Sequence, residues 1–315
     1  MAEIRPRWEW RSFGQRFGLA EAQIARLGAS GVHDSDELYL LSGAGANVKI
    51  RDALVDIKVL REVDADGRSR NVSDGYVSRA PGDQAMLALD LDPIAHRFAA
   101  GSQSRYQAAL LAGVLDDEIM AVDVPSARKG ESRQVSVDEH PRAQSDFSAL
   151  SRLKPLFEGG VVTAGNASGI NDGAAALVLG NREIGLAHGV APMARILSSA
   201  VVGVEPRIMG IGPHQAIVVA LQRAGIGLEQ VDLIEINEAF APQVLGCLKA
   251  LELSFDDPRV NPNGGAIAMG HPLGASGARL VLSACRTLQR QQQRYAVVSL
   301  CVGVGQGVAM VIERV

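Results

Sequence analysis

The sequence predicts an α/β fold in which a mixed or parallel sheet is layered with helices. Beyond Thr163, short apolar runs alternate with helical segments, an order that places helices on the faces of a sheet. Polar or glycine-rich turns follow several of these runs, and open α/β sheets bind ligands at such strand ends. The first 70 residues differ in texture and predict a separate, unrelated α+β segment.

The N-terminal segment has the alternation of β-strands. In residues 47–60, Val48 and Ile50 face one way while Lys49 and Arg51 face the other, so we expect two half-buried strands. Basic residues on one strand face suit either an antiparallel sheet with a solvated face or a phosphate-binding barrel. The polar run that follows, residues 66–81, is rich in Gly, Ser and Arg and predicts a linker.

The elements expected after the linker follow from hydrophobic periodicity and from glycine and proline punctuation. Charged residues 128–142 predict a surface loop or hairpin. Helices are predicted at residues 93–115, 181–188, 213–224, 241–251 and 274–289. Strands are predicted at residues 174–179, 195–204, 231–236, 295–301 and 308–312.

The amino-acid composition and net charge exclude some classes of function. Of 315 residues, 47% are hydrophobic and 21% charged, and the formal net charge of -4 argues against a nucleic-acid or anionic-membrane partner. No apolar run approaches the roughly 18 residues of a membrane span, and the charged N-terminus has no secretory pattern. We therefore expect a cytoplasmic protein whose three cysteines, Cys247, Cys285 and Cys301, are free thiols.

Two motifs of small and polar residues could bind a ligand. Residues 163–173 let a ligand approach the main chain, and Ser168 can donate a hydrogen bond there; a tight loop with capped turns is the alternative. Residues 237–241, Asn-Glu-Ala-Phe-Ala, follow a predicted strand. Asn237 could hold a water in fixed orientation or act as an N-cap. We expect Glu238 beside the first turn of the next helix, where its charge suits the helix dipole.

Two further motifs could carry chemistry. Residues 261–278 run from a glycine-rich loop to a helix start, and His271 could donate a hydrogen bond to a developing oxyanion; a structural histidine is the alternative. Residues 301–307 place a thiol at the end of a buried strand, which suits acid–base chemistry on carbon. An inert buried thiol is the alternative, and it is what we expect of Cys247 and Cys285, both within predicted helices.

In this order, the four motifs resemble the signature of the thiolase family. Residues 163–173 resemble its coenzyme A loop and residues 237–241 its Asn-Glu-Ala-Phe motif. Gly270-His-Pro resembles its Gly-His-Pro motif, and residues 301–307 its terminal Cys-Gly-Gly stretch. The resemblance covers about residues 88–315 and implies a thiolase-like mixed sheet layered with helices. The domains it implies are an unassigned segment at 1–70, a loop domain with a remnant of the first half at 71–193, and a C-terminal domain at 194–315.

The resemblance also implies an activity, that of an acyltransferase acting on acyl-CoA or 3-oxoacyl-CoA in lipid and fatty acid metabolism. Cys301 would remove a proton from the α-carbon, and His271 with a water held by Asn237 would stabilise the enolate. The Gly303 amide would contribute to a second oxyanion hole. Coenzyme A binding would fall to Ser168, Arg142, Ala164 and Ala239. The thioester is the substrate, with no cofactor or metal besides it, and the expected partners are coenzyme A and either a homo-oligomer or a complementing subunit.

Three departures from the family pattern matter. The family's nucleophilic cysteine lies in the first half, whereas no cysteine precedes Cys247 here. Residues 1–70 do not resemble that first half. Val304 stands where the family usually has Gly, and a β-branched residue is poorly suited to a positive φ. Three hypotheses follow: an acyltransferase with an impaired covalent route, a non-catalytic coenzyme A-binding protein, and a truncated or fused thiolase relic.

Overall fold

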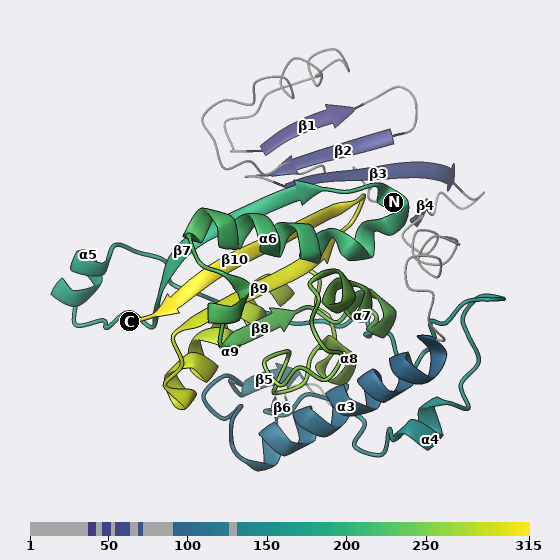
Figure 1. Ribbon diagram of the computed structural model, residues 1–315, viewed down its shortest axis with the longest axis horizontal. Coiled ribbons are helices and arrows are strands. Elements are labelled where there is room, and N and C mark those ends of the chain that lie inside the picture. Colours follow the sequence, from purple (N-terminus) through teal and green to yellow (C-terminus); the bar gives the residue numbers. More distant parts are fainter. Residues whose placement is uncertain (1–36, 42–45, 52–53, 64–68, 72–90, 126–130) are drawn as a thin grey trace. The chain divides into compact units, whose positions relative to one another are not determined.

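The computed structural model describes residues 37–41, 46–51, 54–63, 69–71, 91–125 and 131–315 (Figure 1). Contacts divide the chain into two units, Met1–Arg79 and Ala80–Val315, and each is described by itself. The predicted linker, residues 66–81, lies outside the described residues apart from 69–71, which form a strand.

The first unit contains a four-stranded antiparallel sheet with the order β1–β2–β3–β4. In the β2–β3 pair, Val48 lies opposite Ile57 and Lys49 opposite Asp56. The two strands predicted within residues 47–60 are therefore confirmed, whereas their half-burial falls outside what is described. The strands are β1 (Glu37–Leu41), β2 (Ala46–Arg51), β3 (Leu54–Val63) and β4 (Ser69–Asn71).

The second unit is built on a four-stranded sheet with the order β7–β10–β9–β8. β10 pairs antiparallel with both β7 and β9, whereas β8 pairs parallel with β9. The sheet is therefore mixed, as predicted. Its strands are β7 (Ala194–Gly203), β8 (Leu233–Ile236), β9 (Tyr295–Val302) and β10 (Gln306–Arg314).

The two faces of this sheet belong to separate apolar cores. Ile234 packs in a core shared with α6 (Gly212–Ala224) and α7 (Ala241–Ala250). Its neighbour Leu233 packs in a second core with α9 (Ser276–Gln291). Because successive strand residues point to opposite faces, helices cover both sides of the sheet (Figure 1).

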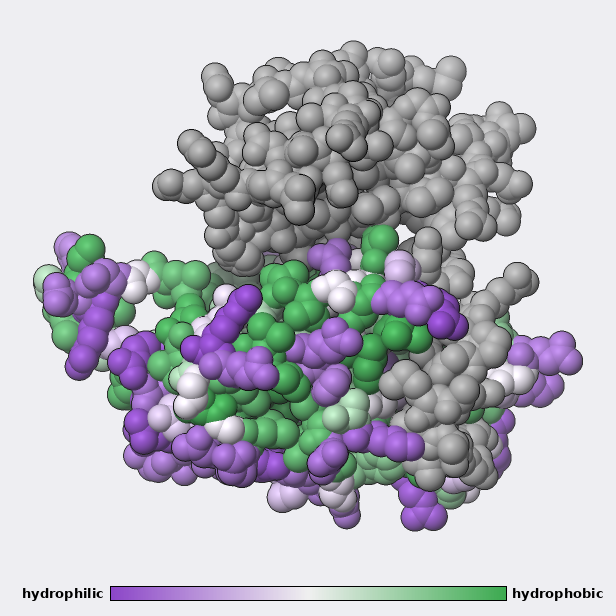
Figure 2. All heavy atoms as spheres, turned by 45° about the horizontal axis from the view of Figure 1, so that its top comes forward, coloured by the Kyte–Doolittle hydropathy of each residue, from purple (hydrophilic) through white to green (hydrophobic). Residues whose placement is uncertain are grey.

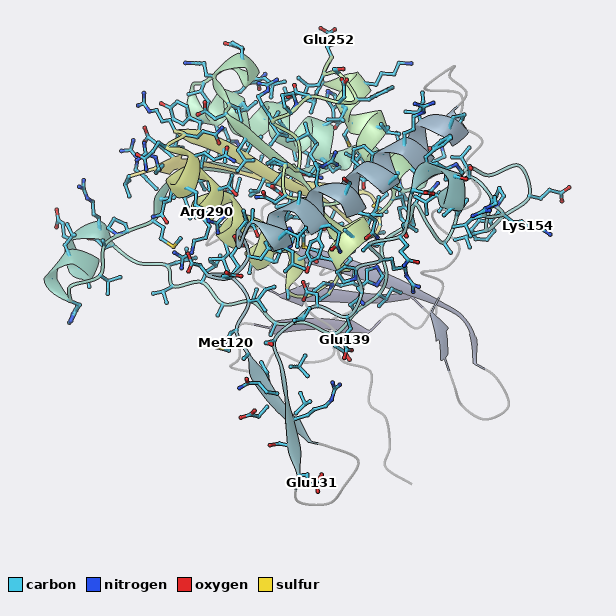
Figure 3. The ribbon with its side chains drawn as sticks, turned by 90° about the horizontal axis from the view of Figure 1, so that it is seen from below. Met120, Glu131, Glu139, Lys154, Glu252 and Arg290 are labelled. Atoms are coloured by element: carbon cyan, nitrogen blue, oxygen red, sulfur yellow. The ribbon has the colours of Figure 1, made fainter. Side chains whose placement is uncertain are left out.

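A helical layer and a hairpin complete the unit. Helix α3 packs against α4, α7 and α8. Figure 3 shows the β5–β6 hairpin extending away from the body, with Glu131 near its tip and Met120 near its base. A surface loop or hairpin was predicted at 128–142; a hairpin forms, but only its second strand, β6, lies in that range, and its first strand, β5, precedes it. The remaining elements are α3 (Leu91–Leu111), β5 (Val122–Pro125), β6 (Ser132–Val135), α4 (Phe147–Leu150), α5 (Arg182–Ala187), α8 (Ala266–Met269), and the 3₁₀ turns η2 (Pro206–Ile211) and η3 (Leu228–Gln230).

All predicted helices are confirmed, and so are all predicted strands of this unit except one. Helix α5 illustrates the agreement: Asn181 caps its start by accepting a hydrogen bond from the Glu183 N–H at 2.7 Å. Cys247 in α7 and Cys285 in α9 are buried mid-helix, as expected. Within the described residues, no helix combines the length and apolar character needed to cross a bilayer.

The strand predicted at residues 174–179 is wrong. These residues adopt no regular secondary structure, and Val178 and Leu179 are 98% and 73% exposed. A strand forms only where a neighbour pairs with its N–H and C=O groups, and no described strand pairs with this run. Other apolar side chains of the described residues are exposed as well. Figure 2 shows one face of the molecule, on which hydrophobic residues are gathered.

The turn between β9 and β10 contains a strained residue. Val304 has φ +69 and Gly305 has φ +90, so both adopt the left-handed region. The left-handed conformation costs a residue with a Cβ roughly 1–2 kcal/mol. The concern raised by the sequence is therefore confirmed, because a β-branched residue occupies a position with positive φ.

We predict that Val304→Gly stabilises the protein. Relief of the left-handed strain outweighs the roughly 0.5–1 kcal/mol of chain freedom that glycine loses on folding, so a net gain of about 0.5–1 kcal/mol is expected. Urea unfolding followed by circular dichroism measures it. Val302→Gly, in the adjacent strand, is the control and should destabilise. A loss of stability in Val304→Gly would contradict the strain argument.

Candidate active site

An asparagine and a histidine from distant motifs meet at the end of β8. The Asn237 Nδ2 lies 3.3 Å from the His271 Nε2. Asn237 is fully buried, and its main-chain N–H donates to the Ser299 carbonyl of β9 at 2.9 Å. The N-cap of α7 is Phe240, so the reading of Asn237 as an N-cap is excluded. Its side chain is directed to the imidazole instead.

The His271 ring is fixed from both sides. Its Nδ1 lies 2.5 Å from the Ser276 hydroxyl, while Nε2 faces Asn237. Its main-chain N–H donates to the Gly169 carbonyl at 3.0 Å, which ties it to the loop at 163–173. Burial, reinforced by the positive charge of Arg279, lowers the pKa of His271 to about 4. The imidazole is therefore neutral at pH 7 and can donate from one nitrogen only.

Cys301 lies on β9, two residues beyond the carbonyl that holds Asn237. Its thiol is buried, and this burial raises the pKa of Cys301 to about 11. The group is therefore a thiol at neutral pH, and deprotonation gives a strong base. Gly303 follows in the turn, where a Cβ would meet no atom within 4 Å, so open space lies beside its backbone.

The loop at 163–173 runs beside the segment that follows β8. The Ser168 N–H donates to the Ala239 carbonyl at 2.9 Å, and Ala167 forms an antiparallel bridge with Phe240. Two of the residues predicted to bind coenzyme A, Ser168 and Ala239, are thus neighbours. Ala164 is exposed in the tight turn before them, where the Thr163 N–H donates to the Asn166 side chain at 2.8 Å.

Arg142 belongs to an adjacent loop. Its side chain is exposed, and its main-chain N–H donates to the Gln103 side chain of α3 at 2.9 Å. His140, two residues earlier, reaches the loop at 163–173, where a Cβ on Gly169 would collide with its ring. Burial and then the charge of Arg142 lower the pKa of His140. Arg142 and Ser168 thus lie in neighbouring loops, and the Arg142 side chain is exposed to solvent.

Glu238 occupies a different place from the one expected. Its buried carboxylate accepts hydrogen bonds from the Ser102 hydroxyl at 2.6 Å, the Asn261 amide at 3.0 Å and the Ile267 N–H at 3.2 Å. The Arg105 guanidinium lies 4.0 Å away. The expectation of a position at the first turn of α7 is wrong, because partners from α3, the 261–265 loop and α8 satisfy the carboxylate instead.

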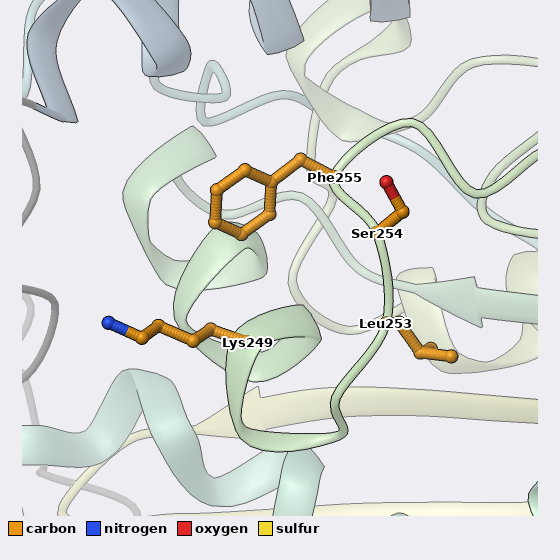
Figure 4. Close-up of a pocket in the computed structure, with 4 residues that line it drawn as sticks. All are labelled: Lys249, Leu253, Ser254 and Phe255. Atoms are coloured by element: carbon orange, nitrogen blue, oxygen red, sulfur yellow. The ribbon is translucent and has the colours of Figure 1, made fainter.

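A separate hollow lies on the surface near the end of α7. Figure 4 shows its four lining residues, Lys249, Leu253, Ser254 and Phe255. It contains neither the motif residues nor a pair of groups suited to proton transfer, so we do not assign chemistry to it. In the described part of the chain, no cluster of three or more His, Cys, Asp and Glu side chains could hold a metal ion.

Sequence reasoning missed several residues of the site. Ser276 contacts the His271 ring, and the Asn171 side chain accepts from the His271 N–H at 3.2 Å. Asn261 bonds both main-chain groups of Ile236, at 2.9 and 2.8 Å, and so fixes the end of β8. All three lie inside motifs that we singled out, so their polar character among small residues was the available signal.

Comparison with known proteins gives a consistent result. Residues 94–183 match the family "Thiolase, N-terminal domain" and residues 190–314 match "Thiolase, C-terminal domain". The chain is 51% identical over 219 residues to the 3-oxoadipyl-CoA/3-oxo-5,6-dehydrosuberyl-CoA thiolase of Escherichia coli, covering 69% of this chain and 54% of that protein. It is 44% identical over 284 residues to the beta-ketoadipyl-CoA thiolase of Pseudomonas putida, covering 87% and 67%.

Solved structures agree. The acetyl-CoA acetyltransferase of Bacillus anthracis superposes with a TM-score of 0.73 at 38% identity, covering 79% of this chain and 65% of that one. Human mitochondrial 3-ketoacyl-CoA thiolase gives 0.67 at 40% identity, covering 74% and 58%. It has also been solved in complex with CoA. The chain spans about half the length of several of the curated relatives it matches.

We predict that Glu238→Ala destabilises the protein by about 3 kcal/mol or more, since it leaves three buried donors unpaired. Chemical unfolding measures the loss, with Glu229→Ala as the control because that carboxylate is exposed. The control should stay within about 0.5 kcal/mol of the wild type. Equal stability of the two variants would show that the Glu238 contacts do not hold the site together.

Proposed function

The chain belongs to the thiolase family, and on this basis we propose that it acts on the thioester group of acyl-CoA or 3-oxoacyl-CoA. The observation that carries the proposal is the buried pair of Asn237 and His271, 3.3 Å apart, beside the strand end that bears Cys301. A neutral imidazole and a carboxamide in a buried site suit the stabilisation of an oxyanion. Cys301 supplies the base.

The proposed step is enolisation of the thioester. The Cys301 thiolate takes a proton from the α-carbon, the C–H electron pair forms the carbon–carbon double bond of the enolate, and the carbonyl π pair moves onto the oxygen. His271 and Asn237 stabilise the negative charge that develops there. Because the pKa of Cys301 is raised to about 11, only a small fraction is thiolate at pH 7, but that fraction is strongly basic.

The acyl chain is proposed from the relatives. Two of them are thiolases for 3-oxoadipyl-CoA or beta-ketoadipyl-CoA by name, so 3-oxoadipyl-CoA is the first 3-oxoacyl substrate to test. Coenzyme A itself is proposed to lie along Ser168 and Ala239, which are neighbours through a 2.9 Å hydrogen bond, with Arg142 and Ala164 toward its nucleotide end.

Acyl transfer needs a second nucleophile besides the base. The other two thiols are poor candidates, because each is buried in an apolar core, Cys247 in the core of α6 and α7 and Cys285 in the core of α9. Both lie within helices that pack on the sheet. We therefore propose that this chain enolises thioesters and that complete acyl transfer requires a nucleophile from a complementing subunit. The same lack of a second active thiol favours the other candidate, a non-catalytic coenzyme A-binding protein.

We predict slow exchange of the acetyl-CoA α-protons with deuterated water. Proton NMR of acetyl-CoA with the full chain measures it. Since the base is a thiolate with a pKa near 11, the rate should rise about tenfold per pH unit between pH 7 and 9. Cys301→Ala should abolish the exchange and His271→Ala should slow it about 10²–10³-fold.

Cys285→Ala is the matched control, because it removes a buried thiol that lies outside the four motifs, in the apolar core of α9, and should exchange like the wild type. Circular dichroism confirms that each variant is folded. Exchange by Cys301→Ala at the wild-type rate sinks the proposal. Absence of exchange in the folded wild type, together with coenzyme A binding, leaves the binding protein as the function. A stable acetyl adduct on Cys301 after incubation with acetoacetyl-CoA, seen by mass spectrometry, would show a covalent route.

We predict that Arg142→Ala weakens coenzyme A binding about fivefold, the equivalent of about 1 kcal/mol for one exposed charge pair. The loss should shrink at high salt, because the phosphate contact is screened. Calorimetric titration at low and high salt measures both. Arg133→Ala in the β5–β6 hairpin is the control, since that side chain pairs with Glu139 at 3.3 Å. Equal affinities of the two variants would remove Arg142 from the binding site.

A further inference from the structure

The hydroxyl of Ser276 makes a short contact with the ring of His271. Its Oγ lies 2.5 Å from the Nδ1, and the residue is buried at the first position of α9. A neutral imidazole has one N–H and one acceptor nitrogen, and the hydrogen bond at one nitrogen fixes the state of the other. The direction of the Ser276–His271 bond therefore decides whether Nε2, the nitrogen that faces Asn237, carries the ring proton.

The Ser276 hydroxyl has one proton and two acceptors in reach, the His271 Nδ1 and the Pro272 carbonyl at 3.0 Å. The Pro272 carbonyl already accepts the main-chain N–H groups of Ala275 at 2.8 Å and Ser276 at 2.9 Å. Its two lone pairs are thus engaged. The imidazole nitrogen is closer and has no other donor among the described residues, so the hydroxyl proton belongs on the Ser276–His271 bond.

The assignment fixes the orientation of the Asn237 carboxamide. Its Oδ1 is buried without a hydrogen-bond partner among the described residues, while its Nδ2 faces the His271 Nε2. A 180° turn of the carboxamide places Oδ1 opposite Nε2, where it accepts a hydrogen bond from the Nε2–H. With Nε2 protonated, this turn pairs the ring N–H with the Asn237 oxygen and avoids two donors facing each other.

We propose that Ser276 is a positioning residue that donates to Nδ1 of His271 and thereby holds the ring as the Nε2–H tautomer. Its link to catalysis rests on the proposed function, because Nε2–H can donate to Asn237 in the resting protein and to a thioester enolate oxygen that takes its place when substrate is bound. The opposite tautomer would present a lone pair to that oxygen and repel it. The tautomer itself is a property of the resting protein and does not depend on any activity.

Nitrogen-15 NMR of the full chain with labelled histidine tests the assignment at pH 7. The His271 signals are identified by their loss in His271→Gln. In the wild type, Nδ1 should give the shift of an unprotonated ring nitrogen and Nε2 that of a protonated one. Ser276→Ala should move both shifts toward each other as the tautomers mix, and Ser276→Thr, which keeps the hydroxyl, should restore them.

Ser283→Ala is the matched control, because this serine of the same helix binds the Glu118 carboxylate at 2.6 Å and should leave the His271 shifts unchanged. A protonated Nδ1 in the wild type overturns the proposal, and so do unchanged shifts in folded Ser276→Ala. If Ser276→Ala does not fold, the wild type and Ser276→Thr decide by themselves.

Deuterium exchange into acetyl-CoA gives an independent readout. Ser276→Ala should slow the exchange by about tenfold or more, short of the 10²–10³-fold typical for losing an oxyanion donor outright, and Ser276→Thr should recover it. Exchange that is unaffected in Ser276→Ala counts against its positioning role. The expected tautomer without any exchange by the wild type would instead defeat the proposed function and leave the tautomer assignment standing.

Discussion

The buried carboxylate of Glu238 is the contact on which the candidate site depends. It accepts hydrogen bonds from the Ser102 hydroxyl, the Asn261 amide and the Ile267 N–H, and so joins α3, the loop before α8 and α8 itself. A buried charge is tolerated only with such partners, and losing one would leave it uncompensated. Asn237 is its chain neighbour, so the pairing of Glu238 anchors the main chain from which the Asn237 side chain reaches His271.

The strand ends and the glycine-rich loops depend on that arrangement. Asn261 bonds both main-chain groups of Ile236 and the Glu238 carboxylate, so one side chain fixes the end of β8 and the carboxylate beside it. A Cβ on Gly265 would collide with the same carboxylate. Glycine is required there by close approach rather than by flexibility. The site thus depends both on polar side chains that pair with one another and on glycine, whose lack of a side chain leaves room for them.

Much of the fold could be predicted because its signals are local. The apolar run of β8, the periodicity of α9 and the Asn181 cap each lie within a few residues. Residues 174–179 have the same strand pattern, yet they stay unpaired and exposed, because pairing is a tertiary property that a short apolar run does not contain. Chain pattern therefore predicts which segments can form strands, and neighbours decide which of them do.

The site was predictable as a set of residues but not as a set of contacts. Asn237 and His271 stood out by composition, whereas their 3.3 Å approach joins positions 34 residues apart. Ser276 is a polar residue among small ones in its motif, but its contact with the His271 ring comes from the position of the hydroxyl at the start of α9, which the sequence does not contain.

Burial has opposing effects on the proposed chemistry. It raises the pKa of Cys301 to about 11, which makes the thiolate scarce at neutral pH but increases its basicity toward a weakly acidic carbon. It lowers the pKa of His271 to about 4, which keeps the ring neutral and able to donate a single hydrogen bond. The same low polarity strengthens each hydrogen bond to a developing oxyanion. In a buried site, therefore, a smaller fraction of Cys301 is thiolate, but the enolate is stabilised more strongly. This balance suits abstraction of a carbon-bound proton.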